Sequence, residues 1–174
     1  MSSSFTSYLF NADAESVYRA TCHPFLIQAG QGSLPNSTLC QWLVQDAYYQ
    51  MAYVNFLGGM LSKISFSLSS FPSNFTETFL SFTEVSHGWQ SKEESDLIWS
   101  TFSILTDALS NIKREMQFYG DTARNYGLEL EVRYPDDTTE EYMQLFKDVS
   151  APDCHILDGL IVLWATERVR IAAA

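Results

Sequence analysis

Residues 34–64, LPNSTLCQWLVQDAYYQMAYVNFLGGMLSKI, decide the fold expected of this chain. No proline follows Pro35 in this segment of about thirty residues, so the segment can form one long helix. Asn36 or Ser37 is expected to cap the start of that helix, with the proline directly before them.

One face of the predicted helix is aromatic and apolar, with a single carboxylate in its middle. The residues on this face recur every three or four positions: Leu39, Trp42, Asp46, Tyr49, Tyr53, Phe56 and Met60. A helix packs such a face inward, where an ionised aspartate costs on the order of several kcal/mol unless it is paired. Asp46 is therefore either a core residue bonded to a tyrosine hydroxyl or a backbone donor, or a pocket residue that faces a polar ligand. The helix alone leaves both interpretations open.

The composition predicts a single globular domain over residues 1–174 and disfavours several classes of partner. The net charge of −11 argues against nucleic acids and anionic membrane surfaces, both of which attract lysine and arginine. No apolar run approaches the ~18 residues of a membrane-spanning helix. Three cysteines without a CxxC pair, and an N-terminus without a signal-peptide pattern, predict a cytoplasmic protein.

The rest of the chain predicts further helices and no strands. A first helix is expected at residues 12–22, ended by His23-Pro24, and a short helical turn at 25–29. The segment 76–89 is weakly helical. A second long helix is expected at 91–126, ended by Gly127. Its apolar face consists of Leu97, Phe102, Leu105, Leu109, Ile112, Met116 and Tyr119.

Two shorter helices are expected after residue 136. Thr138 or Thr139 is predicted to cap a helix at 140–149, and Pro152 to start a last helix that runs to the C-terminus. Helices joined by short loops predict an all-α bundle.

The last predicted helix also carries a carboxylate on an apolar face. The residues of that face are Ile156, Leu160, Leu163, Trp164, Glu167 and Ile171. Two inward carboxylates among tyrosines, Asp46 and Glu167, suggest general acid/base chemistry in a dry pocket, where burial raises a carboxyl pKa. The alternative is a pair of core carboxyls bonded to tyrosine hydroxyls and to Arg168.

Other chemistries lack the residue patterns that they need. His23, His87 and His155 form no Glu-x-x-His pair and lie near predicted helix breaks, so we expect no metal site and place these histidines at helix ends. The Cys22-His23 and Cys154-His155 pairs are adjacent in sequence, and adjacent side chains on a helix point about 100° apart, so neither is a ready dyad. No P-loop, GxGxxG or GxSxG motif occurs, and we expect no cofactor.

Three short motifs early in the chain resemble the opening of the thiaminase-II (TenA-like) family. They are His23-Pro24-Phe25, Gly32-Ser33-Leu34-Pro35 and Gln45-Asp46-Ala47-Tyr48-Tyr49, in the order and spacing of the family. Further on, PDDTTEEYMQLF with Tyr142 and LDGLIVLWATE with Glu167 resemble two later helices. The resemblance spans roughly residues 12–168.

The resemblance implies a heme-oxygenase-like bundle and a salvage hydrolase, which converts amino- or formylamino-pyrimidine breakdown products of thiamin into hydroxymethylpyrimidine. It implies that Asp46 holds the pyrimidine and that Tyr49, Tyr53 and Tyr142 stack on it or bond to it. The nucleophilic cysteine of one branch is absent, and Glu167 stands in that region, as in a second branch. Glu167 is then the catalytic acid/base, and Cys154, at the opposite end of its helix, is a poor substitute.

Two hypotheses for function follow from the resemblance. The first is a cofactor-free hydrolase of thiamin fragments, and the second is a catalytically inactive relative that binds a small aromatic ligand or a partner subunit. Family members continue through two further helices, so the chain resembles a C-terminally truncated form with an uncovered face. We therefore expect a homo-oligomer, with Trp164 and Ile171 near the exposed edge.

Overall fold

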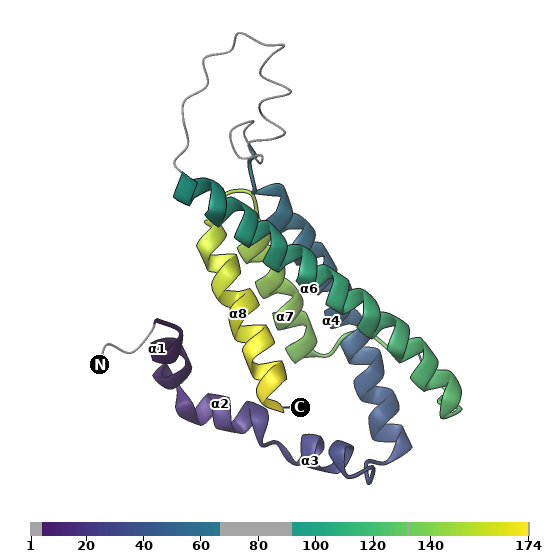
Figure 1. The fold of residues 1–174 in the computed structure, drawn as a ribbon. Coiled ribbons are helices and arrows are strands. Elements are labelled where there is room, and N and C mark those ends of the chain that lie inside the picture. The colour runs from purple at the N-terminus through teal and green to yellow at the C-terminus, as the bar shows by residue number, and fades with distance from the viewer. Residues whose placement is uncertain (1–4, 67–91, 132, 174) are drawn as a thin grey trace.

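The computed structural model of this chain describes residues 5–66, 92–131 and 133–173, with side chains up to residue 169. No strand occurs in these ranges, which confirms the all-α fold class. Figure 1 shows the helices: α1 (Phe5–Ala12), α2 (Ala14–Thr21), α3 (Pro24–Gly30), α4 (Asn36–Ser62), α6 (Lys92–Asn125), α7 (Asp137–Ser150) and α8 (Ile156–Ala173). The helix expected at 76–89 lies outside the described residues. Within those ranges, no helix has the length and apolar character that crossing a membrane requires.

The long helices α4 and α6 lie against each other, with α7 beside α4 and α8 beside α7, while α1 stands to the left of the lower part of α8 and α2 and α3 pass below it toward the start of α4 (Figure 1). α4 packs most extensively on α7 and next on α6, and α8 packs on α7 and α2. The predicted long helix is therefore the central element of the described fold.

The core lies in the C-terminal half of α4, where α6, α7 and α8 meet it. Tyr53, Phe56 and Met60 of the predicted apolar face are buried there, which confirms this part of the prediction. Phe56 stacks on Phe146 of α7, with ring centroids 5.0 Å apart. The other helices contribute Leu105, Ala108 and Ile112 of α6 and Leu163 of α8.

The predicted burial of the apolar faces is wrong at several positions of the two long helices, Met116 late in α6 among them. Trp42 in α4 is 39% exposed, and Leu97 in α6 is 68% exposed. Periodicity identifies residues that share a face of a helix, but it does not tell how far a neighbouring helix extends along that face.

Two predicted caps are also wrong. Pro35 precedes the first residue of α4 and offers no side-chain cap, so Asn36 and Ser37 lie inside the first turn. Asp136 caps α7 instead of Thr138 or Thr139, because its Oδ1 accepts a hydrogen bond of 2.8 Å from the Thr139 backbone N–H. The aspartate stands directly before the helix, where a short acceptor reaches the third helical N–H.

The histidines at positions 23 and 155 lie at helix starts, as predicted. The Nδ1 atom of each accepts a backbone N–H two residues on, from Phe25 at 3.2 Å and from Leu157 at 3.2 Å. The last helix starts at Ile156 and not at Pro152, since a turn at 151–154 comes first.

The N-terminal region contains one helix more than predicted. α1 precedes α2, and Asp13 separates them by accepting the Ser16 N–H at 3.0 Å. The hydrogen bonds from Ser16 lower the pKa of the Asp13 carboxyl.

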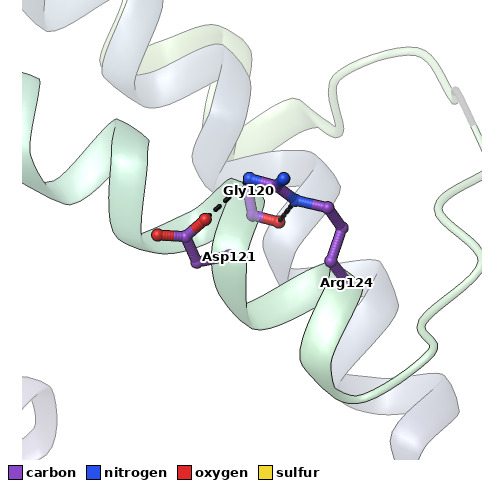
Figure 2. A network of polar contacts seen from close by, with 3 residues as sticks. All are labelled: Gly120, Asp121 and Arg124. Atoms are coloured by element: carbon purple, nitrogen blue, oxygen red, sulfur yellow. Dashed lines mark hydrogen bonds and ion pairs between the residues drawn. The ribbon is translucent and has the colours of Figure 1, made fainter.

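The end of α6 is the predicted one. Gly127 has φ +59°, and the N–H groups of Gly127 and Leu128 bond to the carbonyls of Arg124 at 3.2 Å and Ala123 at 2.9 Å. Two hydrogen bonds of this kind, around a glycine in the left-handed conformation, are a common way for a helix to end. Earlier in α6, the helix continues through Gly120, whose carbonyl accepts from Arg124 Nε at 3.1 Å while Arg124 Nη2 donates to Asp121 at 2.6 Å (Figure 2).

Candidate functional site

A cavity of about 620 Å³ opens where α3, α4, α6, α7 and α8 come together, and we call it the main cavity because predicted site residues line it. It is lined by Leu26, Trp42, Asp46, Tyr49, Glu115, Tyr119, Tyr142, Leu145, Val162, Ala165, Thr166 and Val169. Three of the five predicted site residues, Asp46, Tyr49 and Tyr142, are in this set. Residues almost a hundred positions apart in sequence therefore meet at one cavity, because α7 packs along α4.

Asp46 is half-buried at the cavity wall and accepts a hydrogen bond of 2.7 Å from Gln50 Nε2. Gln50 is 3% exposed, so its amide holds the carboxylate from the protein side. The predicted partners were tyrosine hydroxyls or backbone groups. The glutamine one turn later on the same helix was missed, although its spacing of four residues brings the two side chains together.

Tyr49 and Tyr142 form the aromatic corner of the cavity. Their rings meet edge to face, with centroids 5.8 Å apart. Tyr142 is 45% exposed, so its ring also faces solvent. A flat aromatic ligand can stack on one ring and meet the edge of the other in such a corner.

Tyr53 and Glu167 form a layer behind this corner. The Tyr53 hydroxyl donates a hydrogen bond of 2.6 Å to Glu167 Oε1, and neither residue is among those that line the main cavity. Tyr53 is fully buried and stacks on Tyr49, with centroids 5.9 Å apart and planes 10° apart. The predicted bond between Glu167 and a tyrosine is therefore present, but Arg168 lies over the Phe10 ring at 5.0 Å and does not join it.

A smaller cavity of about 390 Å³ adjoins the main one, and we call it the second cavity. The two share Trp42, Asp46, Tyr49 and Tyr142, which form a common wall. The remaining lining is polar apart from one ring: Phe25, Thr38, Gln41, Gln45, Asp136, Thr138 and Thr139.

Glu115 and Tyr119 are site residues that the sequence analysis did not identify as such. They lie one turn apart on α6, and Glu115 brings a second carboxylate to the lining of the main cavity in addition to that of Asp46. Tyr119 also contacts Trp42, with ring centroids 5.7 Å apart, and Trp42 contacts Phe25 at 5.6 Å. None of the described lining residues is basic, so the main cavity favours cations and hydrogen-bond donors.

The remaining reactive groups of the described chain lie outside this site. Cys154 is not among the lining residues, and desolvation, followed by the Asp158 carboxylate 3.5 Å away, raises the pKa of its thiol. A thiol with a raised pKa is a weak nucleophile at neutral pH. The described residues contain no group of three or more His, Cys, Asp or Glu side chains placed to hold a metal ion.

Comparison with known families identifies the segment that carries Asp46 and Tyr49. Residues 12–68 match the TENA/THI-4/PQQC family. The match covers α2, α3 and α4, including Tyr53, whereas Tyr142 and Glu167 lie beyond it. The TENA family adopts a heme-oxygenase-like helical fold, and the described helices agree with that fold.

Two relatives match most of the chain. A "Probable transcription factor" of Fusarium pseudograminearum (strain CS3096) is 29% identical over 164 residues, which are 94% of this chain and 29% of that protein. A "Probable bifunctional TENA-E protein" of Glycine max is 21% identical over 150 residues, which are 86% of this chain and 53% of that protein. The chain thus spans about a third and about half of the length of these relatives.

Proposed function

We propose that the main cavity binds an aminopyrimidine fragment of thiamin and that the protein hydrolyses this fragment to hydroxymethylpyrimidine. The observation that carries the proposal is the meeting of Asp46, Tyr49 and Tyr142 at one cavity, on a chain whose residues 12–68 match the TENA family. The volume of about 620 Å³ lies within the range of small-molecule sites, roughly 300–1,000 Å³.

Each lining group has a role in binding the ring. The Asp46 carboxylate accepts hydrogen bonds from the pyrimidine, and Gln50 keeps that carboxylate in place. The Tyr49 and Tyr142 rings lie at 76° to each other, so one flat heterocycle can stack on one ring and meet the edge of the other. Tyr53 is buried and stacks on Tyr49, so it holds the Tyr49 ring in position and does not contact the ligand.

The charge of the lining favours the amine over its formyl derivative. Because the product carries a hydroxymethyl group, the substrate amine must sit on the same methylene carbon. Such a primary amine is a cation at neutral pH, whereas the formylated nitrogen is neutral. Asp46 and Glu115 both line the main cavity and attract the cation.

Glu167 is the group that we assign to acid/base catalysis. It takes a proton from the attacking water as the new carbon–oxygen bond forms, and the broken carbon–nitrogen bond releases ammonia. Glu167 stands in the region where another TENA branch has its nucleophilic cysteine, but in our proposal the nucleophile is the water molecule. The residue before it, Thr166, lines the main cavity, whereas the Glu167 side chain points about 100° away around α8, so the proposed base must reach its water from beside the lining.

The proposal is tested by turnover and binding measured side by side. The protein is incubated with the aminopyrimidine and with formylaminopyrimidine, and hydroxymethylpyrimidine is measured by chromatography. Asp46→Asn should weaken binding about ten- to a hundredfold, the effect of a lost charge-assisted hydrogen bond. Glu167→Gln should keep binding and lower kcat about 10²- to 10⁴-fold.

Asp107→Asn is the matched control, since Asp107 is exposed on α6 and is not a lining residue. It should leave both quantities unchanged. Wild-type protein that neither binds nor converts either compound would refute the proposal.

The second candidate is a protein that binds the same ligand without turnover. Its supporting observation is that Glu167 bonds to Tyr53 and is not among the residues that line the main cavity. The fungal relative is named a probable transcription factor, which accords with a domain that binds and does not convert. Micromolar binding by calorimetry with no hydroxymethyl product would favour this candidate.

We further propose that the chain forms a homo-oligomer. Leu157 and Ile161 lie one turn apart on α8 and are 57% and 41% exposed. Trp164, in the next turn, is half-buried, and the side chain of Ile171 lies outside the described residues. Exposed apolar side chains that line up on one helix are typical of interfaces. A monomer in sedimentation at micromolar concentration would contradict this proposal.

A further inference from the structure

We propose that Gln45 is a positioning residue of this site: it fixes the start of α7 and thereby holds Tyr142 against Tyr49. Its consequence for the ligand rests on the function proposed above, whereas its consequence for the protein does not.

The amide of Gln45 bonds at both ends to the segment that leads into α7. Its Nε2 donates to the Tyr134 carbonyl at 3.2 Å, and its Oε1 accepts from the Asp136 N–H at 2.8 Å. These two hydrogen bonds, called the Gln45 clamp below, join positions 89 and 91 residues apart in sequence. Only a primary amide supplies a donor and an acceptor side by side, so neither Glu nor Met reproduces both bonds.

Asp136 passes this restraint to the helix. Its carboxylate caps α7 through the Thr139 N–H at 2.8 Å, and its carbonyl accepts the Glu140 N–H at 2.9 Å. In many helices the side chain of the third residue accepts a hydrogen bond from the backbone N–H of the N-cap residue. Here Gln45 supplies that acceptor from α4, so the cap of one helix is held by the side chain of another.

Tyr142 lies within reach of this restraint. It follows Asp136 by six residues, about 9 Å along the helix axis. α4 contacts α7 again at this level, through Tyr49, which lies one turn after Gln45. The Gln45 clamp and the Tyr49–Tyr142 ring contact are therefore two adjacent attachments between the same pair of helices.

The side chain of Tyr134 offers no substitute for the clamp. It is 93% exposed, so this residue is held through its backbone. The ion pair between Arg133 and Glu131, at 3.0 Å, joins two exposed residues of the same connection and does not tie it to α4. Loss of the Gln45 amide should thus loosen the start of α7.

The test is Gln45→Met, which keeps the length of the side chain and removes both hydrogen bonds. Gln144→Met is the matched control, because Gln144 is exposed on α7 and bonds only to Asp148, at 2.6 Å, among its described side-chain contacts. Amide hydrogen exchange at Asp136 should become about tenfold faster in Gln45→Met, with Phe56 and Leu57 in the core protected as in the wild type. The ring protons of Tyr142, which lie against Tyr49, should shift in spectra recorded without ligand.

Affinity for the aminopyrimidine should fall about five- to tenfold in Gln45→Met, the effect of one neutral hydrogen bond. A double-mutant cycle separates positioning from general loosening. If Gln45 acts through Tyr142, then adding Gln45→Met to Tyr142→Ala should change affinity less than twofold. An undiminished five- to tenfold loss in that background would overturn the proposal.

Two further outcomes would also overturn it: unchanged exchange at Asp136, or faster exchange with an unshifted Tyr142 ring. If the wild type binds no pyrimidine, the function proposed above fails, and the exchange rates and ring shifts still decide whether Gln45 positions Tyr142.

Discussion

Gly58 and Gly59 are adjacent in α4, yet alanine should affect them in opposite directions. A Cβ atom at Gly58 meets nothing within 4 Å. A Cβ atom at Gly59 lies 2.8 Å from the Ser150 Cβ and 3.2 Å from the Ser150 carbonyl oxygen, at the end of α7. The close approach of two helices at Gly59 therefore leaves no room for a methyl group.

The magnitudes follow from this geometry. Either substitution gains about 1 kcal/mol of helix propensity. At Gly59 the two carbons must separate by about 0.7 Å to reach an ordinary contact of about 3.5 Å. Overpacking of this kind costs about 1–3 kcal/mol. We therefore expect Gly58→Ala to be about 1 kcal/mol more stable than the wild type, and Gly59→Ala about 1 kcal/mol less stable.

Urea and thermal unfolding of the two variants measure this difference of about 2 kcal/mol. For a domain of this size it corresponds to a gap of about 4–8 °C in Tm, with Gly58→Ala the higher. Equal Tm values, or a lower value for Gly58→Ala, would show that α4 and α7 do not approach as described.

Three further predictions concern individual polar groups. Tyr53→Phe removes the hydroxyl that donates to Glu167 and should lower the free energy of unfolding by about 1–2 kcal/mol, measured by urea titration. This is the value of a charge-assisted hydrogen bond, reduced because Glu167 is partly exposed. The control Tyr142→Phe should change the same free energy by less than about 0.5 kcal/mol. Glu115→Gln should reduce the ratio of kcat/KM for the amine over the formylamine by about three- to tenfold, and an unchanged ratio would remove Glu115 from substrate selection. The lowered pKa of Asp13 implies that its cap stabilises α2 fully at a pH above the usual aspartate pKa, and that this stabilisation is lost as the pH falls through the lowered pKa. The protection of the Ser16 amide from hydrogen exchange should fall over the same pH range in the wild type. In Asp13→Asn, which has no carboxyl to protonate, that protection should not change over this range.

The sequence was sufficient for features that depend on local periodicity and on backbone-breaking residues. The long helix α4 follows from an uninterrupted run after Pro35, and Gly127 ends α6 because a left-handed residue is needed there. The spacing placed Asp46 and Tyr49 on one face of a helix but left open whether that face packs in the core or lines a pocket, and the resemblance favoured the pocket at which both residues lie. Tyr142 at the same cavity was implied by the resemblance, and its spacing alone did not indicate it.

Features that depend on how helices cross could not be predicted in this way. The bond between Tyr53 and Glu167 joins residues 114 positions apart, and the Gln45 clamp joins α4 to the segment before α7. No sequence motif marks Glu115 as a site residue. Its place in the lining of the main cavity depends on the angle at which α6 crosses α4. Such angles are determined by the packing of side chains along the whole contact.

Ligand binding and turnover depend on different carboxylates of the proposed site. Binding requires only groups that already line the main cavity: Asp46 from α4, Glu115 from α6 and Tyr142 from α7. Turnover also requires the Glu167 carboxylate, whose Oε1 accepts from the buried Tyr53, to reach a water molecule in the main cavity, although Glu167 is not among the lining residues. The affinity for the aminopyrimidine should therefore depend on Asp46 and not on Glu167. Turnover, in contrast, depends on whether the Glu167 carboxylate reaches that water, so a protein of this architecture can retain its ligand after losing its reaction.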